Sequence, residues 1–296
     1  MQSAMLKSDI QIRGETSALP QAGYQSEAIL QSPLGRIGSL EVRLARDEEE
    51  VAAAQRLRFR VFYEELGAGR AGERIPDQRD SDRFDAVCDH LLVIDTATAG
   101  SPQERIVGTY RLLRQDRAAE IGGFYSSAEF ELETLIARHP DRNFLELGRS
   151  CVMAEYRTKR TVELLWQGIW AYCRLHGIDV MTGCASFAGI VPAAHAEALS
   201  FLHHFCLAQE PWRVRAVAER YECMDLMPIE AINDRSALSA MPPLLKGYLR
   251  LGARFGEGCV VDRDFGTTDV LVVLPVEAIS QRYINYYGPD AQRFAG

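Results

Sequence analysis

The sequence contains no long hydrophobic segment. A helix needs about 20 consecutive apolar residues to span a bilayer, and the apolar runs here, such as Val270–Leu274, have only the length of a strand. The N-terminus also has no basic region followed by an apolar stretch, so we expect no export signal. Together these absences predict a cytoplasmic protein, and they leave open a peripheral contact with the inner face of the membrane.

Paired cysteines are absent as well. The chain has 7 cysteines, an odd number, and no two of them form a Cys-x-x-Cys pair. We therefore expect buried thiols in a reducing compartment rather than disulfides or a zinc site. No spacing of His, Cys and carboxylate residues matches a metal cage, so the sequence predicts neither a bound metal nor a bound cofactor.

Basic residues are fewer than acidic residues. Lys and Arg number 33 against 41 Asp and Glu, which gives a formal net charge of −8. Nonspecific nucleic-acid binding depends on excess positive charge over a surface, so no nucleic-acid partner is expected. The apolar share of 47% is ordinary for a globular protein, and 296 residues can bury a sizeable core.

Composition divides the chain into three parts. Residues 1–36 are rich in Gln, Ser, Gly and Ala, and they predict a flexible N-terminal extension. Residues 37–280 predict a single domain with an extended C-terminal part, and residues 281–296 predict a C-terminal tail. Within the domain, residues 67–89 are polar and broken by Gly and Pro. They predict a long loop of the kind that often carries function.

Helical and strand patterns alternate within the domain. Asp47 predicts the N-cap of a helix with an acidic first turn, and Thr161 is expected to cap a long amphipathic helix that ends at Gly177. The order of elements predicts an α+β fold with a central mixed, mostly antiparallel sheet flanked by helices. We expect strands at 40–44, 90–95, 105–113, 144–153, 178–184, 260–261 and 270–274, and helices at 48–66, 126–137, 161–177, 192–207 and 242–251.

A basic turn precedes the helix at 161–177. Arg157, Lys159 and Arg160 lie next to an expected helix N-terminus, where cations and backbone N–H groups together favour a phosphate. The alternative is a solvated basic turn. Strand, turn and helix over residues 147–176 resemble the acyl-pantetheine-binding motif of the GNAT superfamily. The turn lacks the Gly-rich loop of CoA-dependent members, so the resemblance implies an acyl carrier protein as donor.

Four upstream segments extend this resemblance. Arg58–Phe62, Asp82–Asp85, Gly108–Leu113 and Glu146–Arg149 are similar to elements that occur in the same order in acyl-homoserine-lactone synthases of this superfamily. Other segments look closer to the L-ornithine Nα-acyltransferases, and the likeness covers residues 40–274. These segments are residues 122–126, 146–151, 156–166, 243–253 and 264–270.

The resemblance implies a GNAT-type acyltransferase that moves a 3-hydroxyacyl group from acyl carrier protein to the α-amine of L-ornithine. The carrier would supply the phosphopantetheine, and the product would be lyso-ornithine lipid, with a downstream O-acyltransferase as an optional partner. Three alternatives stay open. They are an acyl-homoserine-lactone synthase that uses S-adenosylmethionine, an N-acyl amino acid synthase for another amine, and a noncatalytic module that binds acyl carrier protein, lipid or membranes.

The resemblance also implies catalytic roles for Glu146, Arg111 and Arg149. Glu146 would accept the proton of the amine, directly or through water, or hold the amine in place. A structural ion pair with Arg149 or Arg111 is the alternative. Either arginine could bind the ornithine carboxylate through two parallel hydrogen bonds. The alternative for both is an interior network with Glu146, Asp82 and Asp85 that orders the long loop.

Two further groups complete the expected site. Asp82 and Asp85 would face the second ammonium group of ornithine, and Arg58 would pair with their loop; a solvated acidic face is the alternative. A net negative enzyme needs a local basic patch to meet an acidic carrier. The residues expected to bind the phosphopantetheine phosphate and the acidic face of the carrier are Arg157, Lys159, Arg160 and Thr161.

Overall fold

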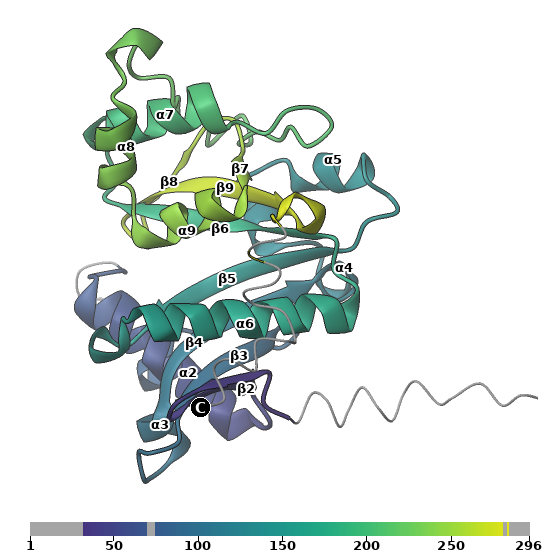
Figure 1. Ribbon diagram of the computed structural model, residues 1–296, viewed down its shortest axis with the longest axis vertical. Coiled ribbons are helices and arrows are strands. Elements are labelled where there is room, and N and C mark those ends of the chain that lie inside the picture. Colours follow the sequence, from purple (N-terminus) through teal and green to yellow (C-terminus); the bar gives the residue numbers. More distant parts are fainter. Residues whose placement is uncertain (1–31, 70–74, 281–282, 284–296) are drawn as a thin grey trace, which may run out of the picture.

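One nine-stranded sheet forms the centre of the molecule (Figure 1). The structure is a computed structural model that describes residues 32–69, 75–280 and 283. Within these residues the strands follow the order β1-β2-β3-β4-β5-β6-β9-β7, and β8 pairs with β9. The bounds are Gly35–Ile37 (β1), Leu40–Leu44 (β2), Asp89–Asp95 (β3), Ile106–Arg114 (β4), Phe144–Val152 (β5), Val180–Ala188 (β6), Arg254–Phe255 (β7), Val260–Asp262 (β8) and Thr267–Pro275 (β9).

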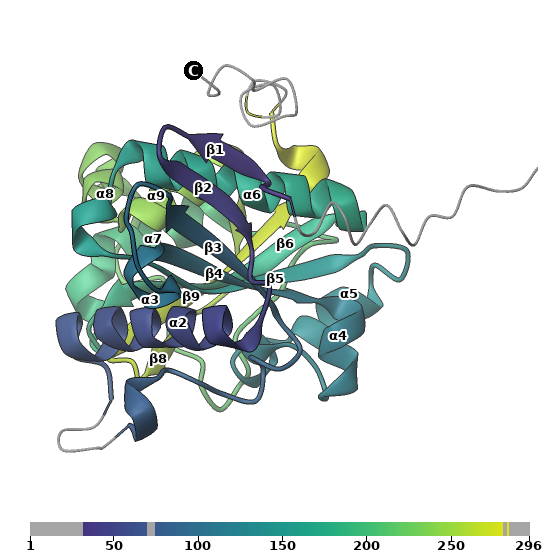
Figure 2. The same ribbon diagram turned by 90° about the horizontal axis from the view of Figure 1, so that it is seen from below.

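Helices cover both faces of this sheet (Figure 2). On one face, α6 (Lys159–His176), α7 (Ala196–Cys206) and α9 (Pro243–Leu251) share a hydrophobic core with the strands. On the other face, α2 (Glu48–Phe59) packs against β3, β4 and β5. The remaining helical segments are α3 (Pro102–Arg105), α4 (Gln115–Glu120), α5 (Leu132–Ala137), α8 (Asp234–Ala240) and the short η1 (Arg60–Glu65), η2 (Pro76–Gln78), η3 (Tyr125–Ala128), η4 (Ala154–Tyr156), η5 (Pro192–His195), η6 (Ile229–Ala231) and η7 (Val276–Ala278).

The two long helices begin at side-chain caps. Asp47 accepts a hydrogen bond from the backbone N–H of Glu50 at the start of α2. Thr158 accepts one from the backbone N–H of Thr161 at the start of α6. Gly177 ends α6 with φ of 59°, a left-handed conformation that glycine adopts without steric cost. Local sequence therefore determines where both helices start and where α6 stops.

Strands β5 and β6 pair in parallel and then separate, whereas the other named strand pairs of the described sheet are antiparallel. Their pairing runs from Phe144 opposite Val180 to Glu146 opposite Thr182. The next residue of β6, Gly183, has φ of +145°, and a Cβ atom there would lie 2.3 Å from the carbonyl oxygen of Leu147. Only glycine fits this approach, so the sequence itself marks the point where the strands diverge.

Strand β5 also carries a bulge on its other edge. The register against β4 shifts between Thr109 and Arg111, where β5 has an extra residue. Arg149 lies in the bulge with φ of 50°, an uncommon conformation for a non-glycine residue. A bulge re-aims side chains and withdraws residues from the regular ladder. Here it turns the segment around Arg149 and Ser150 toward the gap between β5 and β6, where both residues line a cavity.

Most predicted elements are confirmed. The α+β class, the mostly antiparallel sheet and the hairpin of β8 with β9 are as expected. Three assignments need correction. Thr158 rather than Thr161 caps α6, the helix expected at 126–137 is two short helices, η3 and α5, and Gly35 and Arg36, assigned to the N-terminal extension, form β1 with Ile37.

Some expectations concern residues that the structure does not describe. Residues 1–31 of the expected extension, and all but residue 283 of the expected tail, lie outside the described ranges. The helices α4 and α8 and the strand β7 were not anticipated from the sequence. No helix of the described ranges combines the length and the apolar character that crossing a membrane requires.

Candidate active site

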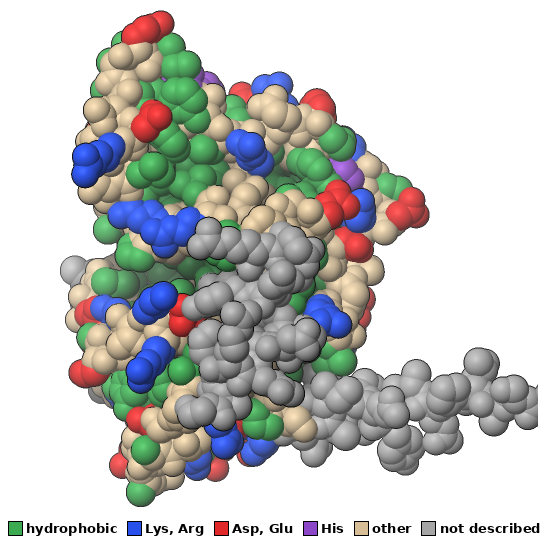
Figure 3. Space-filling model, viewed as in Figure 1, with side chains coloured by type: hydrophobic (Ala, Val, Ile, Leu, Met, Phe, Trp, Pro, Cys, Tyr) green, Lys and Arg blue, Asp and Glu red, His purple; other side chains and the backbone are tan. Residues whose placement is uncertain are grey.

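A cavity of about 350 Å³ opens where β5 and β6 separate. Its walls come from β4, β5, β6 and β9, from η1 and from α9. On the face shown in Figure 3, a hollow lies between the part of the molecule that carries α9 and the part that carries α6, and Lys and Arg side chains border it. Charged side chains that line the cavity are Arg111, Glu146, Arg149, Asp262 and Asp269.

Glu146 occupies the last paired position of β5 and β6. It is 4% exposed and lines the cavity. One carboxylate oxygen accepts hydrogen bonds from the backbone N–H and the hydroxyl of Ser126, at 2.8 and 2.5 Å. The other accepts one from the backbone N–H of Tyr125 at 2.8 Å. Burial raises the pKa of Glu146, and these hydrogen bonds offset the rise only in part.

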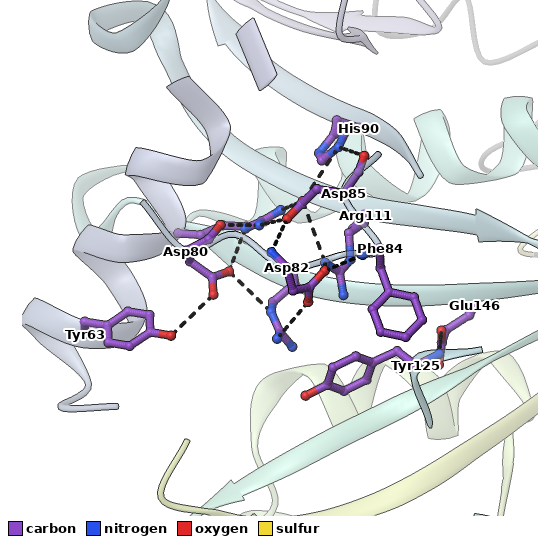
Figure 4. Close-up of polar contacts among 11 residues, drawn as sticks. Tyr63, Asp80, Asp82, Phe84, Asp85, His90, Arg111, Tyr125 and Glu146 are labelled. Carbon is purple, nitrogen blue, oxygen red and sulfur yellow. Dashed lines mark hydrogen bonds and ion pairs between the residues drawn. The ribbon is translucent and has the colours of Figure 1, made fainter. Parts of the chain in front are cut away.

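No ion pair joins Glu146 to Arg111 or Arg149 in the described part of the chain. The alternative in which Glu146 is the structural partner of one of these arginines is therefore wrong. The carboxylate is instead held by neutral donors from the η3 segment, with Tyr125 beside it (Figure 4). The charge of Arg111 also acts to lower the pKa of Glu146, but burial outweighs it. A buried carboxylate with an elevated pKa is suited to take a proton from a group in the cavity.

Arg58 is the centre of a second polar network, and the residue is 0% exposed. It donates to Asp80 at 2.8 Å and to Asp85 at 2.8 Å. Burial alone would raise the pKa of Asp85, but the hydrogen bonds and charge of Arg58 outweigh it and lower the pKa to about 2. Arg58 therefore ties the long loop to α2, as its place in the apolar register of that helix predicted.

Arg111, which is labelled in Figure 4, and Arg149 complete this network. Arg111 pairs with Asp82 at 2.7 Å, and Arg149 contacts Asp80 at 3.3 Å and Asp82 at 3.4 Å. The interior network that orders the loop is thus present, but it includes Asp80 and leaves out Glu146. We call these six residues the loop network: Arg58, Arg111, Arg149, Asp80, Asp82 and Asp85.

The loop network changes the expected substrate contacts. Asp82 and Asp85 are both engaged by arginines, and neither they nor Arg58 are among the described residues that line the cavity. Arg111 and Arg149 do line it. The guanidinium of Arg149 also lies over the rings of Tyr125 and Phe265, at 4.7 and 4.4 Å from their centroids. The arginines are therefore the part of this network that can reach a ligand.

A second acidic group reaches the same cavity through two of its three members, Asp262 and Asp269, and the sequence interpretation missed it. Glu129, Asp262 and Asp269 are all buried, and one carboxylate oxygen from each lies within 4.8 Å of the others. We call these three residues the acidic cluster. Its geometry could hold a metal ion or another cation. The three residues come from separate segments, so no spacing in the sequence reveals them.

The basic turn is only partly as expected. Arg157 pairs with Glu65 and donates to the carbonyl of Val152. Lys159 is 85% exposed at its side chain and pairs with Glu163, and Arg160 is exposed. Thr161 is buried, and its hydroxyl donates to the carbonyl of Tyr156 at 2.6 Å. The hydroxyl of Thr161 is thus engaged within the protein, and its expected role at a phosphate stays a prediction.

Comparisons with known proteins give a family model, curated relatives and solved structures that are similar to this chain. Residues 57–167 match the acetyltransferase (GNAT) domain. The chain is 62% identical over 261 residues to the L-ornithine N(alpha)-acyltransferase of Brucella abortus (strain 2308), covering 88% of this chain and 93% of that protein. It is 61% identical over 262 residues to the enzyme of the same name from Agrobacterium fabrum (strain C58 / ATCC 33970), covering 88% and 89%. Among solved structures, FeeM, an N-acyl amino acid synthase from uncultured soil microbes, has 12% identity and a TM-score of 0.45, covering 80% of this chain and 91% of that one.

Proposed function

This chain belongs to the L-ornithine N(alpha)-acyltransferase family, and from that premise we propose that it transfers a 3-hydroxyacyl group from acyl carrier protein to the α-amine of L-ornithine. The chain is an N-acyltransferase with a GNAT domain. The acceptor follows from what its relatives are named for. The 3-hydroxyacyl group and the carrier follow from the resemblance of the motifs and the basic turn.

The observation that carries the proposal is the placement of Glu146. The ornithine α-amine attacks the thioester carbonyl, and the nitrogen must lose a proton as the new C–N bond forms. Glu146 accepts that proton, because its buried carboxylate lines the cavity without an ion pair to a described residue and its pKa is raised by burial. The C–S bond then breaks, and the phosphopantetheine thiolate takes up the proton as it leaves. The products are an Nα-acyl amino acid and the free thiol of the carrier.

The bulge of β5 supports the other half of the reaction. The register shift between Thr109 and Arg111 takes Arg149 and Ser150 out of the regular ladder, and both residues line the cavity. We assign their peptide N–H groups to the thioester carbonyl, which gains negative charge as the amine attacks. The gap between the separated parts of β5 and β6 would admit the pantetheine arm, so the donor needs no bound cofactor beyond the one that it carries.

The acceptor carboxylate fits the arginines of the loop network. Arg149 contacts its two aspartates at 3.3 and 3.4 Å, whereas Arg111 holds Asp82 at 2.7 Å. Arg149 is thus the less tightly paired of the two. A guanidinium presents several N–H donors in a plane and binds a carboxylate well. We assign the acceptor carboxylate to Arg149 and give Arg111 the role of holding Asp82 in place.

The donor approaches from the N-terminus of α6. β5 ends at Val152 and α6 begins at Lys159, on the side where β5 and β6 have separated. Lys159 and Arg160 are exposed there, beside the peptide N–H groups of a helix start, which favour an anion. An acidic carrier with a phosphodiester would be attracted to this end, although the chain as a whole has a net charge of −8.

Product mass spectrometry tests the proposal. Purified protein would be incubated with 3-hydroxyacyl-ACP and an equimolar mixture of L-ornithine, L-lysine and S-adenosylmethionine, and in parallel with 3-hydroxyacyl-CoA as donor. We expect 3-hydroxyacyl-ornithine, formed faster from the carrier than from CoA. Glu146→Gln should lower kcat by about 10²- to 10⁴-fold, while Glu120→Gln, an exposed carboxylate, should not change it.

Other outcomes would contradict parts of the proposal. Formation of an acyl-homoserine lactone would identify the activity as that of a lactone synthase. Formation of acyl-lysine alone would identify lysine, rather than ornithine, as the acceptor. Equal rates with both donors would remove the carrier from the proposal. Wild-type kcat in Glu146→Gln would remove Glu146 from the mechanism. If no amine is acylated but liposomes leak on addition of the protein, the membrane-active alternative would stand instead.

A further inference from the structure

The acidic cluster is a buried group of negative charges with little compensation. Glu129, Asp262 and Asp269 are 3%, 8% and 6% exposed. In the described part of the chain, the one cation paired with any of them is Arg220, at 3.2 Å from Glu129, and its side chain is 36% exposed. Burying ionised carboxylates is costly unless they are paired or bind a cation. The cluster therefore has the electrostatics of a cation site.

One oxygen atom of the cluster has no hydrogen-bond partner among the described residues, although the hydroxyls of Ser186 and Thr267 act on the same carboxyl group and lower its pKa. Asp269 Oδ1 is buried and accepts no hydrogen bond from any described residue. By contrast, Asp262 Oδ1 accepts hydrogen bonds from the backbone N–H groups of Asp264 and Phe265. Asp262 and Asp269 both line the cavity. An unsatisfied buried carboxylate oxygen beside a cavity is explained when a ligand donates to it.

The cluster is connected to Glu146 by direct contacts. Glu146 bonds the hydroxyl of Ser126 at 2.5 Å, Ser126 contacts the thiol of Cys184 at 3.3 Å, and Cys184 contacts Glu129 at 3.2 Å. Only two side chains therefore separate the expected proton acceptor from the cluster. The separation suits two amines that are joined by a short methylene chain, with one at Glu146 and the other at the cluster.

We propose that Glu129, Asp262 and Asp269 bind the side-chain ammonium group of the acceptor and so select a diamino acid. The proposal rests on the proposed function and names a recognition site for it. An ammonium group has three N–H donors, and the cluster offers a carboxylate oxygen from each of three residues. The role that Asp82 and Asp85 were expected to play passes to these residues, because arginines already neutralise Asp82 and Asp85.

A substrate pair isolates this interaction. L-norvaline is the analogue of ornithine with a methyl group in place of the aminomethyl end, so it keeps the α-amine and carboxylate but lacks the ammonium group. A site built to bind a substrate N–H group rejects the analogue that lacks it by a factor on the order of 10⁴. We expect a wild-type preference for ornithine of that size in kcat/KM with 3-hydroxyacyl-ACP.

Asp269→Asn tests the cluster. The variant should lose about 10²-fold in kcat/KM for ornithine, mostly through KM, because the ammonium would lose a charged partner. Turnover of norvaline should be unchanged or faster, so the preference should collapse. Glu129→Gln should do the same, and Asp225→Asn, a carboxylate outside the cavity that pairs with His204, should leave the preference intact. Equal losses for both substrates, or no loss, would overturn the proposal.

Two further measurements separate the remaining outcomes. Calorimetric titration with L-ornithine should show binding to wild-type protein and weaker binding to Asp269→Asn even if no product forms, so failure of the proposed function can be told from failure of this site. Titration with Mg²⁺, Ca²⁺ and Mn²⁺, and assays in EDTA, test a metal. Metal binding that Asp269→Asn abolishes, with activity lost in EDTA, would assign the cluster to a metal and overturn the ammonium proposal.

Discussion

Two groups of acidic residues flank the cavity: the loop network reaches it through Arg111 and Arg149, and the acidic cluster through Asp262 and Asp269. The two groups differ in how their charge is balanced. In the loop network, three aspartates meet three arginines. In the acidic cluster, three carboxylates share one partly exposed arginine. Burial would raise the pKa of a carboxyl group in either place. The difference shows that the partners of a buried acid, rather than its burial, decide whether it serves structure or binding.

The pKa values express this difference. Burial acts to raise the pKa of Asp85, but Arg58 and Arg111 overcome it and the pKa falls to about 2. Burial raises the pKa of Glu129, Asp269 raises it further, and the contacts with Cys184 and Arg220 offset the rise only in part, so the pKa reaches about 7. The loop network is thus stable without a ligand, whereas the acidic cluster gains from a bound cation.

Removing the central cation of the loop network should have the largest effect on the comparison. Arg58→Met would leave Asp80 and Asp85 buried without their main partner, so we expect a loss of about 3 to 5 kcal/mol in the free energy of unfolding. Arg220→Met removes the cation at the acidic cluster and is the matched control. Its pair is partly exposed, so the loss should stay within about 1 kcal/mol. Urea denaturation of both variants measures the free energy of unfolding. Similar losses in the two variants would contradict the claim that the two groups differ in how their charge is balanced.

The pH dependence of acceptor binding should further distinguish the acidic cluster from the loop network. Glu129 faces Asp262, Asp269, Arg220 and the Cys184 thiol. Below a pH of about 7 the carboxyl of Glu129 is protonated without ligand, and an ammonium must displace that proton to bind the carboxylate. The KM for ornithine, divided by that for norvaline, should therefore rise by up to about tenfold per pH unit as the pH falls.

The division by norvaline removes the effect of the α-amine, which both substrates share. In Glu129→Gln the ratio should lose most of this dependence, because the titrating group is gone. A ratio that stays flat in wild-type protein between pH 8 and pH 5 would contradict the assignment of the ammonium group to the cluster. A slope that persists unchanged in Glu129→Gln would assign the titration to another group.

The sequence predicted the loop network better than the acidic cluster, and the reason is physical. Arg58 lies in the apolar register of a helix, and Asp82 and Asp85 lie in one loop. Local sequence patterns are therefore enough to identify these residues as candidates. Glu129, Asp262 and Asp269 are brought together by tertiary structure. Asp262 and Asp269 meet through the β8 and β9 hairpin, whereas Glu129 joins them from the break between η3 and α5, where the sequence interpretation expected a continuous helix.

The same reasoning explains the error at the basic turn. Thr158 and Thr161 both precede an apolar helical stretch, and either could cap it. The capping geometry that distinguishes them depends on the path of the chain after β5, which the sequence pattern does not contain. The position of Glu146, by contrast, followed from the strand pattern and the resemblance, but its partners Tyr125 and Ser126 depend on how η3 packs beside β5.

The most direct test of the central claim compares one aspartate from each group by urea denaturation at pH 7.5. Asp85→Asn should lower the free energy of unfolding by about 3 to 5 kcal/mol, because it leaves Arg58 with too little compensating charge. Asp269→Asn should leave stability unchanged or raise it, because the pKa of Asp269 is raised by burial and by Asp262, so its charged form is unfavourable in the folded protein. A comparable loss of stability in both variants would contradict the claim that one group is balanced for structure and the other is held for a cationic ligand.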